Sequence, residues 1–169
     1  DSPVSSYSTK TALEQNGYLV EYYECPLKAI ERLQLIKPDL IICDLYMPIM
    51  NGDVFVRLLR QDSAFAGIPV VFLSSEVDAR LKIDAVSNGA DDFLTKPIDP
   101  DLFPKYISNR IIRSREQRDV MDRDSLTGLL NHSCIIDHIK ATVKNGAFTS
   151  VSVLMLDIDF FKKVNDNHG

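Results

Sequence analysis

Short apolar runs that alternate with helical patterns constrain the fold of this chain most strongly. The runs are LIIC at 40–43, IPVVFLS at 68–74 and DFLT at 92–95. Between them, apolar residues recur at helical spacing, for example over residues 54–59. Continuous apolar runs predict strands that are covered on both faces. Strands that alternate with helices predict βαβ units with right-handed crossovers, so we expect an α/β fold with a parallel, doubly wound sheet.

The same reasoning predicts the other elements. We expect helices over residues 3–15, 29–36 and around Leu81 to Val86, with Asn88-Gly89 as the end of the last one. YLVEYY at 18–23 and the apolar run at 150–156 predict two further strands, and Ile135 to Ile139 predict a helix that Asn145-Gly146 ends.

Composition excludes several classes of protein. The chain has 169 residues, of which 45% are hydrophobic and 25% charged, as in soluble globular proteins. No apolar run approaches the roughly 20 residues that span a bilayer, and the net charge of −5 argues against a nucleic-acid surface. The three cysteines, Cys25, Cys43 and Cys134, are far apart and lack zinc-site spacing. We therefore expect a cytoplasmic protein with reduced thiols, bound to neither membrane nor nucleic acid.

A chemically different polar side chain stands at the carboxyl end of each of the three predicted strands. Asp44 follows LIIC, Ser74 closes VVFLS and Lys96 follows DFLT. The carboxyl ends of parallel strands form the edge at which α/β sheets bind ligands, so we expect these groups to converge there. An aspartate can attack phosphorus and form an acyl phosphate, with Mg²⁺ and positive charge holding the phosphoryl oxygens. Each residue alone is commonly a turn former, a cap or a surface lysine, and only the joint pattern is specific.

The segments DLYMPIMNG (44–52), LSSE (73–76) and GADDFLTKP (89–97) resemble the signatures of the response-regulator receiver domain. The resemblance covers residues 1–98 and implies a flavodoxin-like fold. It implies that Asp44 takes a phosphoryl group from a histidine kinase or phosphotransfer protein. It further implies Ser74 as the switch hydroxyl, Phe93 as the switch aromatic and Lys96 as the conserved-type lysine, with Lys96-Pro97 in the cis form.

The resemblance also implies a magnesium site and exposes a departure from the family pattern. The Mg²⁺ ligands would be Asp1, Asp44 and the backbone carbonyl of Tyr46. The family begins with a central apolar strand that ends in two acidic residues, whereas this sequence begins at Asp1-Ser2-Pro3. A sheet without its central strand leaves two neighbouring strands without a partner, so we expect either a longer parent chain, which we favour, or another segment or chain in the gap.

Residues 99–123 predict a helical linker. Asp99-Pro100 is a good helix start, a stripe of Phe103, Ile107 and Ile111 follows, and Pro104 should disturb the first turn. Two interpretations remain open. The helix either runs out into solvent, or it connects two domains and pairs with a second copy, although its apolar positions lapse over 113–119.

The segments DSLTGLLNH (124–132) and LDIDFFKKVNDNHG (156–169) resemble the opening third of the GGDEF family, the diguanylate cyclases. His132 stands where that family usually has Arg. For residues 124–169 the resemblance implies Asp157 and the carbonyl of Ile158 as metal ligands. It implies a nucleotide site formed by Phe160, Phe161, Lys162 and Asn165.

These resemblances predict a two-component response regulator whose phosphorylation on Asp44 controls a C-terminal diguanylate cyclase. The GGDEF signature itself is missing, so we expect this chain to be inactive as a cyclase. Its parent would condense two GTP molecules to cyclic di-GMP as a homodimer. The alternative is a non-enzymatic receiver that switches a protein–protein interface. A DNA-binding regulator is disfavoured, because no basic helix-turn-helix follows the linker.

Overall fold

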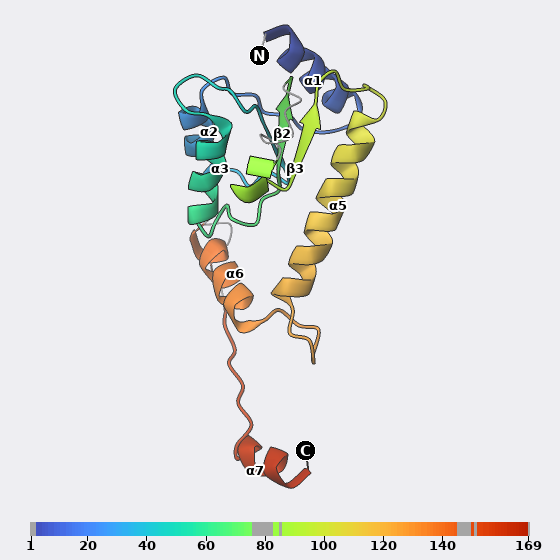
Figure 1. Cartoon of the computed structure of the whole chain (residues 1–169). Coiled ribbons are helices and arrows are strands. Elements are labelled where there is room, and N and C mark those ends of the chain that lie inside the picture. Colours follow the sequence, from blue (N-terminus) through green and yellow to red (C-terminus); the bar gives the residue numbers. More distant parts are fainter. Residues whose placement is uncertain (1–2, 76–82, 85, 145–149, 151, 169) are drawn as a thin grey trace. The chain divides into compact units, whose positions relative to one another are not determined.

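The fold is taken from a computed structural model that describes residues 3–75, 83–84, 86–144, 150 and 152–168 (Figure 1). The chain divides into two compact units, Asp1–Met121 and Asp122–Gly169. Among the helices of the described residues, none is both long and apolar enough to cross a bilayer.

The first unit contains a three-stranded parallel sheet in the order β1-β2-β3. Its strands are β1 (Ile41–Cys43), β2 (Val70–Ser74) and β3 (Asp92–Thr95). All five residues of β2 are buried, as its continuous apolar run predicts for a central strand. The parallel α/β sheet is therefore confirmed.

Among the described elements of this unit, two helices precede β1, one lies between β1 and β2, and one follows β3. The helices are α1 (Pro3–Gln15), α2 (Pro26–Leu33), α3 (Gly52–Gln61) and α5 (Phe103–Asp122). Pro26 occupies the first turn of α2, where its missing N–H costs no hydrogen bond. Leu81 and Ala85, in the helix predicted before Gly89, lie outside the described residues.

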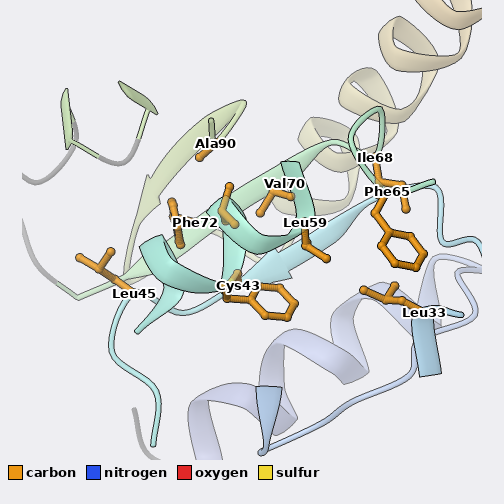
Figure 2. Close-up of a cluster of buried hydrophobic side chains, with 11 residues drawn as sticks. Leu33, Cys43, Leu45, Leu59, Phe65, Ile68, Val70, Phe72 and Ala90 are labelled. Carbon is orange, nitrogen blue, oxygen red and sulfur yellow. The ribbon is translucent and has the colours of Figure 1, made fainter. Parts of the chain in front are cut away.

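Two apolar clusters lie on opposite faces of the sheet. The first joins α2, α3 and the strands, and its buried members include Leu33, Phe55, Leu59 and Phe72 (Figure 2). The second joins α1 to α5 through Leu13, Phe103 and Ile107, with Leu40 and Ile42 beside them. Helices on both faces of a parallel sheet are the doubly wound arrangement expected from the sequence.

The strand predicted over residues 18–23 is wrong. These residues form no strand in the structure, and within the described part of the chain β1 pairs with β2 alone. The local pattern is strand-like, because Tyr18 and Val20 pack on the second cluster while Leu19 between them is 97% exposed. A strand also needs a neighbour for its backbone groups, and the described residues place none beside this segment.

The start of α5 also differs from the prediction. Pro104 does not disturb the helix, because it lies in the first turn of α5 and is buried there. Asp99-Pro100 forms a turn ahead of the helix instead, in which the Asp99 carboxylate accepts hydrogen bonds from the backbone N–H groups of Asp101 and Leu102. The helix then continues without a break to Asp122.

The second unit contains α6 (His132–Lys144) and α7 (Phe161–His168). The strand predicted over 150–156 is wrong, since residues 152–158 have no regular structure and Leu154 and Met155 are more than 80% exposed. As with residues 18–23, no strand of the described residues lies beside this segment. Asn145-Gly146, the predicted end of α6, lies outside the described residues.

Candidate functional site

Asp44 and Lys96 meet at the carboxyl edge of the sheet. Asp44 follows the last residue of β1 and Lys96 follows the last residue of β3, as the sequence predicted. The Lys96 Nζ atom lies 3.8 Å from Asp44 Oδ2, and the two side chains are only 15% and 22% exposed. Burial lowers the pKa of Lys96, while the negative charge of Asp44 and the phenol of Tyr22 oppose that shift.

The strand register places Ser74 at the same carboxyl edge of the sheet as Asp44 and Lys96. Cys43 pairs with Phe72 across β1 and β2, and Ser74 pairs with Thr95 across β2 and β3. The Lys96 backbone N–H donates to the Ser74 carbonyl oxygen at 2.9 Å, and Ser74 is 2% exposed. The pairing of β2 with β3 thus holds Ser74 beside Lys96.

The loop after Asp44 depends on Gly52. The Gly52 N–H donates to the Leu45 carbonyl oxygen at 2.8 Å, which closes the loop onto the start of α3. A Cβ atom on Gly52 would lie 2.3 Å from the Asp44 carbonyl oxygen and 2.5 Å from Phe72 Cε1. Only glycine therefore allows α3 to begin this close to the backbone of Asp44.

Phe93 lies on β3, three residues before Lys96. Its ring is tilted by 49° to that of Phe72, with the ring centroids 6.4 Å apart, and it packs at the margin of the first cluster. The Lys96-Pro97 peptide bond is cis, as the resemblance implied.

A polar cluster that the sequence prediction missed joins β3 to α5. The Asp92 carboxylate accepts hydrogen bonds from the Tyr106 hydroxyl and from the Arg110 guanidinium, and Arg110 also lies over the Tyr106 ring. Asp92 directly precedes Phe93, so the cluster ties the strand that carries Phe93 and Lys96 to the linker helix. The only signal in the sequence was the i, i+4 spacing of Tyr106 and Arg110, which is too common to identify a partner.

Oxygen ligands for a divalent cation are partly assembled. The Asp44 carboxylate supplies the hard oxygen that Mg²⁺ prefers, and its Oδ1 atom accepts from the Tyr46 backbone N–H at 3.4 Å. Asp1, the other expected carboxylate, lies outside the described residues. Within the part of the chain that the structure describes, no three His, Cys, Asp or Glu side chains are close enough to hold a metal ion.

The residues predicted for the nucleotide site in the second unit are close in sequence and exposed. Phe160 takes a φ of 60°, and the Phe161 N–H donates to the Ile158 carbonyl oxygen at 3.2 Å at the start of α7. Lys162 and Asn165 lie on α7, while Asp157 lies in the irregular segment before it. Among the described residues, Asp157 belongs to no group of three or more His, Cys, Asp or Glu side chains that could hold a metal ion.

Comparison with known families accounts for both units. Residues 1–108 match the model of the response regulator receiver domain, and residues 121–169 match that of the diguanylate cyclase GGDEF domain. The receiver match covers more than half of the chain. The chain belongs to the response regulator receiver domain family. Its receiver domain is followed by a partial GGDEF domain.

Individual relatives agree with this assignment. The chain is 32% identical over 108 residues to protein PilH of Pseudomonas aeruginosa, covering 64% of this chain and 89% of PilH. It is 31% identical over 143 residues to the response regulator PleD of Caulobacter vibrioides, covering 78% of this chain and 32% of PleD. It spans only 13% of the sensor histidine kinase TmoS of Ectopseudomonas mendocina.

Solved structures confirm the receiver fold. The signal receiver domain of a putative LuxO repressor from Vibrio parahaemolyticus superposes with a TM-score of 0.64 at 25% identity, covering 70% of this chain and 90% of that domain. A putative response regulator from Chloroflexus aurantiacus gives a TM-score of 0.63 at 26% identity, covering 67% and 93%.

Proposed function

We propose that Asp44 is the phosphoacceptor of this response regulator and that its phosphorylation controls diguanylate cyclase activity in the parent protein. The observation that carries the proposal is the contact between Asp44 and Lys96 at the carboxyl edge of a parallel sheet. A carboxylate beside a partly buried ammonium group is suited to accept a phosphoryl group whose negative charge the ammonium can neutralise.

The phosphoryl group comes from a phosphohistidine of a histidine kinase or phosphotransfer protein. An oxygen of the Asp44 carboxylate attacks phosphorus, the P–N bond breaks, and the histidine nitrogen leaves with the bonding electrons and takes up a proton. Mg²⁺ held by Asp44, the Tyr46 carbonyl and Asp1 would neutralise charge between carboxylate and phosphoryl oxygens. Lys96 then shifts from the Asp44 carboxylate to a phosphoryl oxygen.

The new charge reorganises the residues around it. Phosphorylation adds about −1.5 to −2 charge at neutral pH together with strong acceptor oxygens. The Ser74 hydroxyl donates to one of these oxygens, and the Phe93 side chain moves with it. Because Asp92 is bonded to α5, movement of β3 reaches the linker through Tyr106 and Arg110.

In the parent protein, the linker sets the geometry of a homodimer in which each protomer holds one GTP. Asp157 and the Ile158 carbonyl would hold a metal ion there. The phosphates and the base contact a set of residues in the turn and helix that follow, namely Phe160, Phe161, Lys162 and Asn165. Residues 1–98 act as the receiver, 99–123 as the linker and 124–169 as the start of the cyclase domain. The free cysteines fit a cytoplasmic location.

Acetyl phosphate with Mg²⁺ tests the phosphoacceptor directly. The intact mass of the wild-type chain should rise by one phosphoryl group, and Asp44→Asn should remove that adduct. Asp53→Asn is the matched control, because Asp53 lies on the surface of α3 beside Arg57 and should leave the adduct unchanged. An unmodified wild-type chain would refute the assignment.

The output is tested separately. With GTP and Mg²⁺, this chain should form no cyclic di-GMP, because it lacks the GGDEF signature. Sedimentation of the wild type with and without acetyl phosphate should show a phosphorylation-dependent dimer that Asp44→Asn does not form. A chain that is phosphorylated but stays monomeric would contradict control through the linker and favour a switched interface with another protein.

A further inference from the structure

The linker helix α5 is held to the sheet by polar contacts at two points. The first is the Asp92 cluster, in which Tyr106 and Arg110 bond to the carboxylate at the start of β3. The second lies further along the helix, where Arg115 Nε donates to Asp39 Oδ1 at 3.0 Å and Arg115 Nη2 lies 2.8 Å from Asp39 Oδ2. This contact is bidentate, which gives an ion pair between Arg and a carboxylate a fixed direction as well as strength.

The second contact continues the face of α5 that packs on the receiver. Phe103, Ile107 and Ile111 recur every four residues and pack in the second cluster. Arg115 is the next residue at that spacing, so it lies on the same side of the helix. Residues 113–119 contain no apolar residue, so apolar packing cannot hold this part of the helix to the sheet. The ion pair therefore extends the docked part of α5 by about one turn beyond Ile111.

The two aspartates lie at the opposite ends of the strands that carry the phosphorylation site. Asp39 lies two positions before the first residue of β1, which Asp44 follows. Asp92 begins β3, which Lys96 follows. Because the strands are parallel, both aspartates lie at the amino edge of the sheet, and the contact between Asp44 and Lys96 lies at the carboxyl edge. Each partner of that contact is thus joined to α5 through its own strand, and α5 runs antiparallel to β3 (Figure 1).

We propose that the Asp39–Arg115 pair is a second tether of the linker, so that residues 116–122 follow the position of β1 relative to β3. A helix held at one point can pivot, whereas a helix held at two points must turn when those points move relative to each other. The inference rests on the proposed function, in which Lys96 leaves the Asp44 carboxylate for a phosphoryl oxygen. That exchange alters the contact between the carboxyl ends of β1 and β3, and the two tethers pass the change to α5.

Hydrogen exchange of the whole chain, followed by mass spectrometry, tests the tether without phosphorylation. Asp39→Asn keeps the size of the side chain but removes its charge, and it should speed the exchange of backbone amides over residues 112–119 by roughly two- to fivefold. The double variant Asp39→Lys with Arg115→Glu reverses the pair and should restore the wild-type rate. Arg118→Met is the matched control, because Arg118 bonds to Ser114 of its own helix and should leave the rate nearly unchanged.

Acetyl phosphate with Mg²⁺ then tests the signal. Asp39→Asn should take up the phosphoryl group as the wild type does, because Asp39 lies at the far edge of the sheet from Asp44. Its dimer fraction in sedimentation should no longer rise on phosphorylation, and the reversed pair should restore the rise. The control Arg118→Met should respond as the wild type does.

Three results would overturn the proposal. They are wild-type exchange rates in Asp39→Asn, a dimer response that survives in this variant, and dimers of this variant that form without phosphorylation. The last result would make the pair a latch that opens and not a tether. A wild type that takes up no phosphoryl group, or takes it up and stays monomeric, would refute the proposed function, and the exchange rates would still decide whether the tether exists.

Discussion

Gly52 provides a sharp test of how the loop after Asp44 is held. In Gly52→Ala, the new Cβ atom would lie 2.3 Å from the Asp44 carbonyl oxygen and 2.5 Å from Phe72 Cε1. Both distances are far below the roughly 3.5–4.0 Å of a favourable contact. The first atom belongs to the backbone and the second to a fully buried ring, so neither can move away freely. The backbone of Asp44 must shift to admit the methyl group.

The magnitude follows from two opposing effects. Overpacking of this kind costs about 1–3 kcal/mol, whereas alanine in place of glycine within a helix gains at most about 1 kcal/mol. We therefore expect Gly52→Ala to lower the free energy of unfolding of the receiver by about 1–2 kcal/mol. With a urea m-value of about 1–3 kcal/mol/M, the midpoint should fall by roughly 0.3–2 M. Phosphorylation by acetyl phosphate should also slow, because the displaced backbone carries the Asp44 carboxylate.

Urea unfolding followed by far-ultraviolet circular dichroism measures the effect. Gly67→Ala is the matched control, because a Cβ atom there meets nothing within 4 Å. That variant should leave the midpoint unchanged or raise it slightly, since alanine reduces the entropy of the unfolded chain. A Gly52→Ala protein as stable as the Gly67→Ala protein, with normal phosphorylation, would refute the reasoning.

Three further predictions concern neighbouring groups. Burial lowers the pKa of Lys96 from its ordinary value of 10.5, so just below pH 10.5 the unfolded chain binds more protons than the folded chain. The free energy of unfolding of the wild type, measured in urea titrations, should therefore rise relative to that of Lys96→Met as the pH rises toward 10.5. Arg110→Met removes the ion pair with Asp92, in which both side chains are 30% exposed, and should lower the free energy of unfolding by about 1 kcal/mol. Arg115→Met removes the ion pair with Asp39, in which the side chains are 60% and 49% exposed. This second variant should lower the free energy of unfolding by less, and its effect should disappear in high salt. Burial raises the pKa of the Cys43 thiol, so iodoacetamide should alkylate the other cysteines first and reach Cys43 only after unfolding, as peptide mass spectrometry will show.

Much of the receiver site could be predicted from the sequence, because local pattern and register determine it. The continuous apolar runs predicted β1, β2 and β3, and a parallel sheet brings their carboxyl ends to one edge. The contact between Asp44 and Lys96 follows from that geometry alone. The close approach of Gly52 to the Asp44 backbone and to Phe72 became visible only in the structure.

The failures share a physical cause. Residues 18–23 and 152–156 have strand-like composition, but a strand forms only where a neighbour accepts its hydrogen bonds. Composition cannot report whether that neighbour is present. The Asp92–Arg110 pair was missed for a related reason, since it joins two residues that are 18 positions apart and lie on elements whose alignment depends on packing. The sequence predicted that Pro104 would disturb the first turn of a helix starting at Asp99-Pro100, whereas α5 begins at Phe103 and accommodates Pro104 in its first turn.

The central claim is that Asp44 itself carries the phosphoryl group, and chemical trapping of the acyl phosphate tests it most directly. The chain is treated with acetyl phosphate and Mg²⁺, reduced with borohydride, digested and sequenced by tandem mass spectrometry. Reduction converts an aspartyl phosphate to homoserine and leaves free aspartate unchanged. The account predicts homoserine at position 44 and at no other aspartate. Homoserine at another position, or at none while Asp44 remains intact, would contradict it.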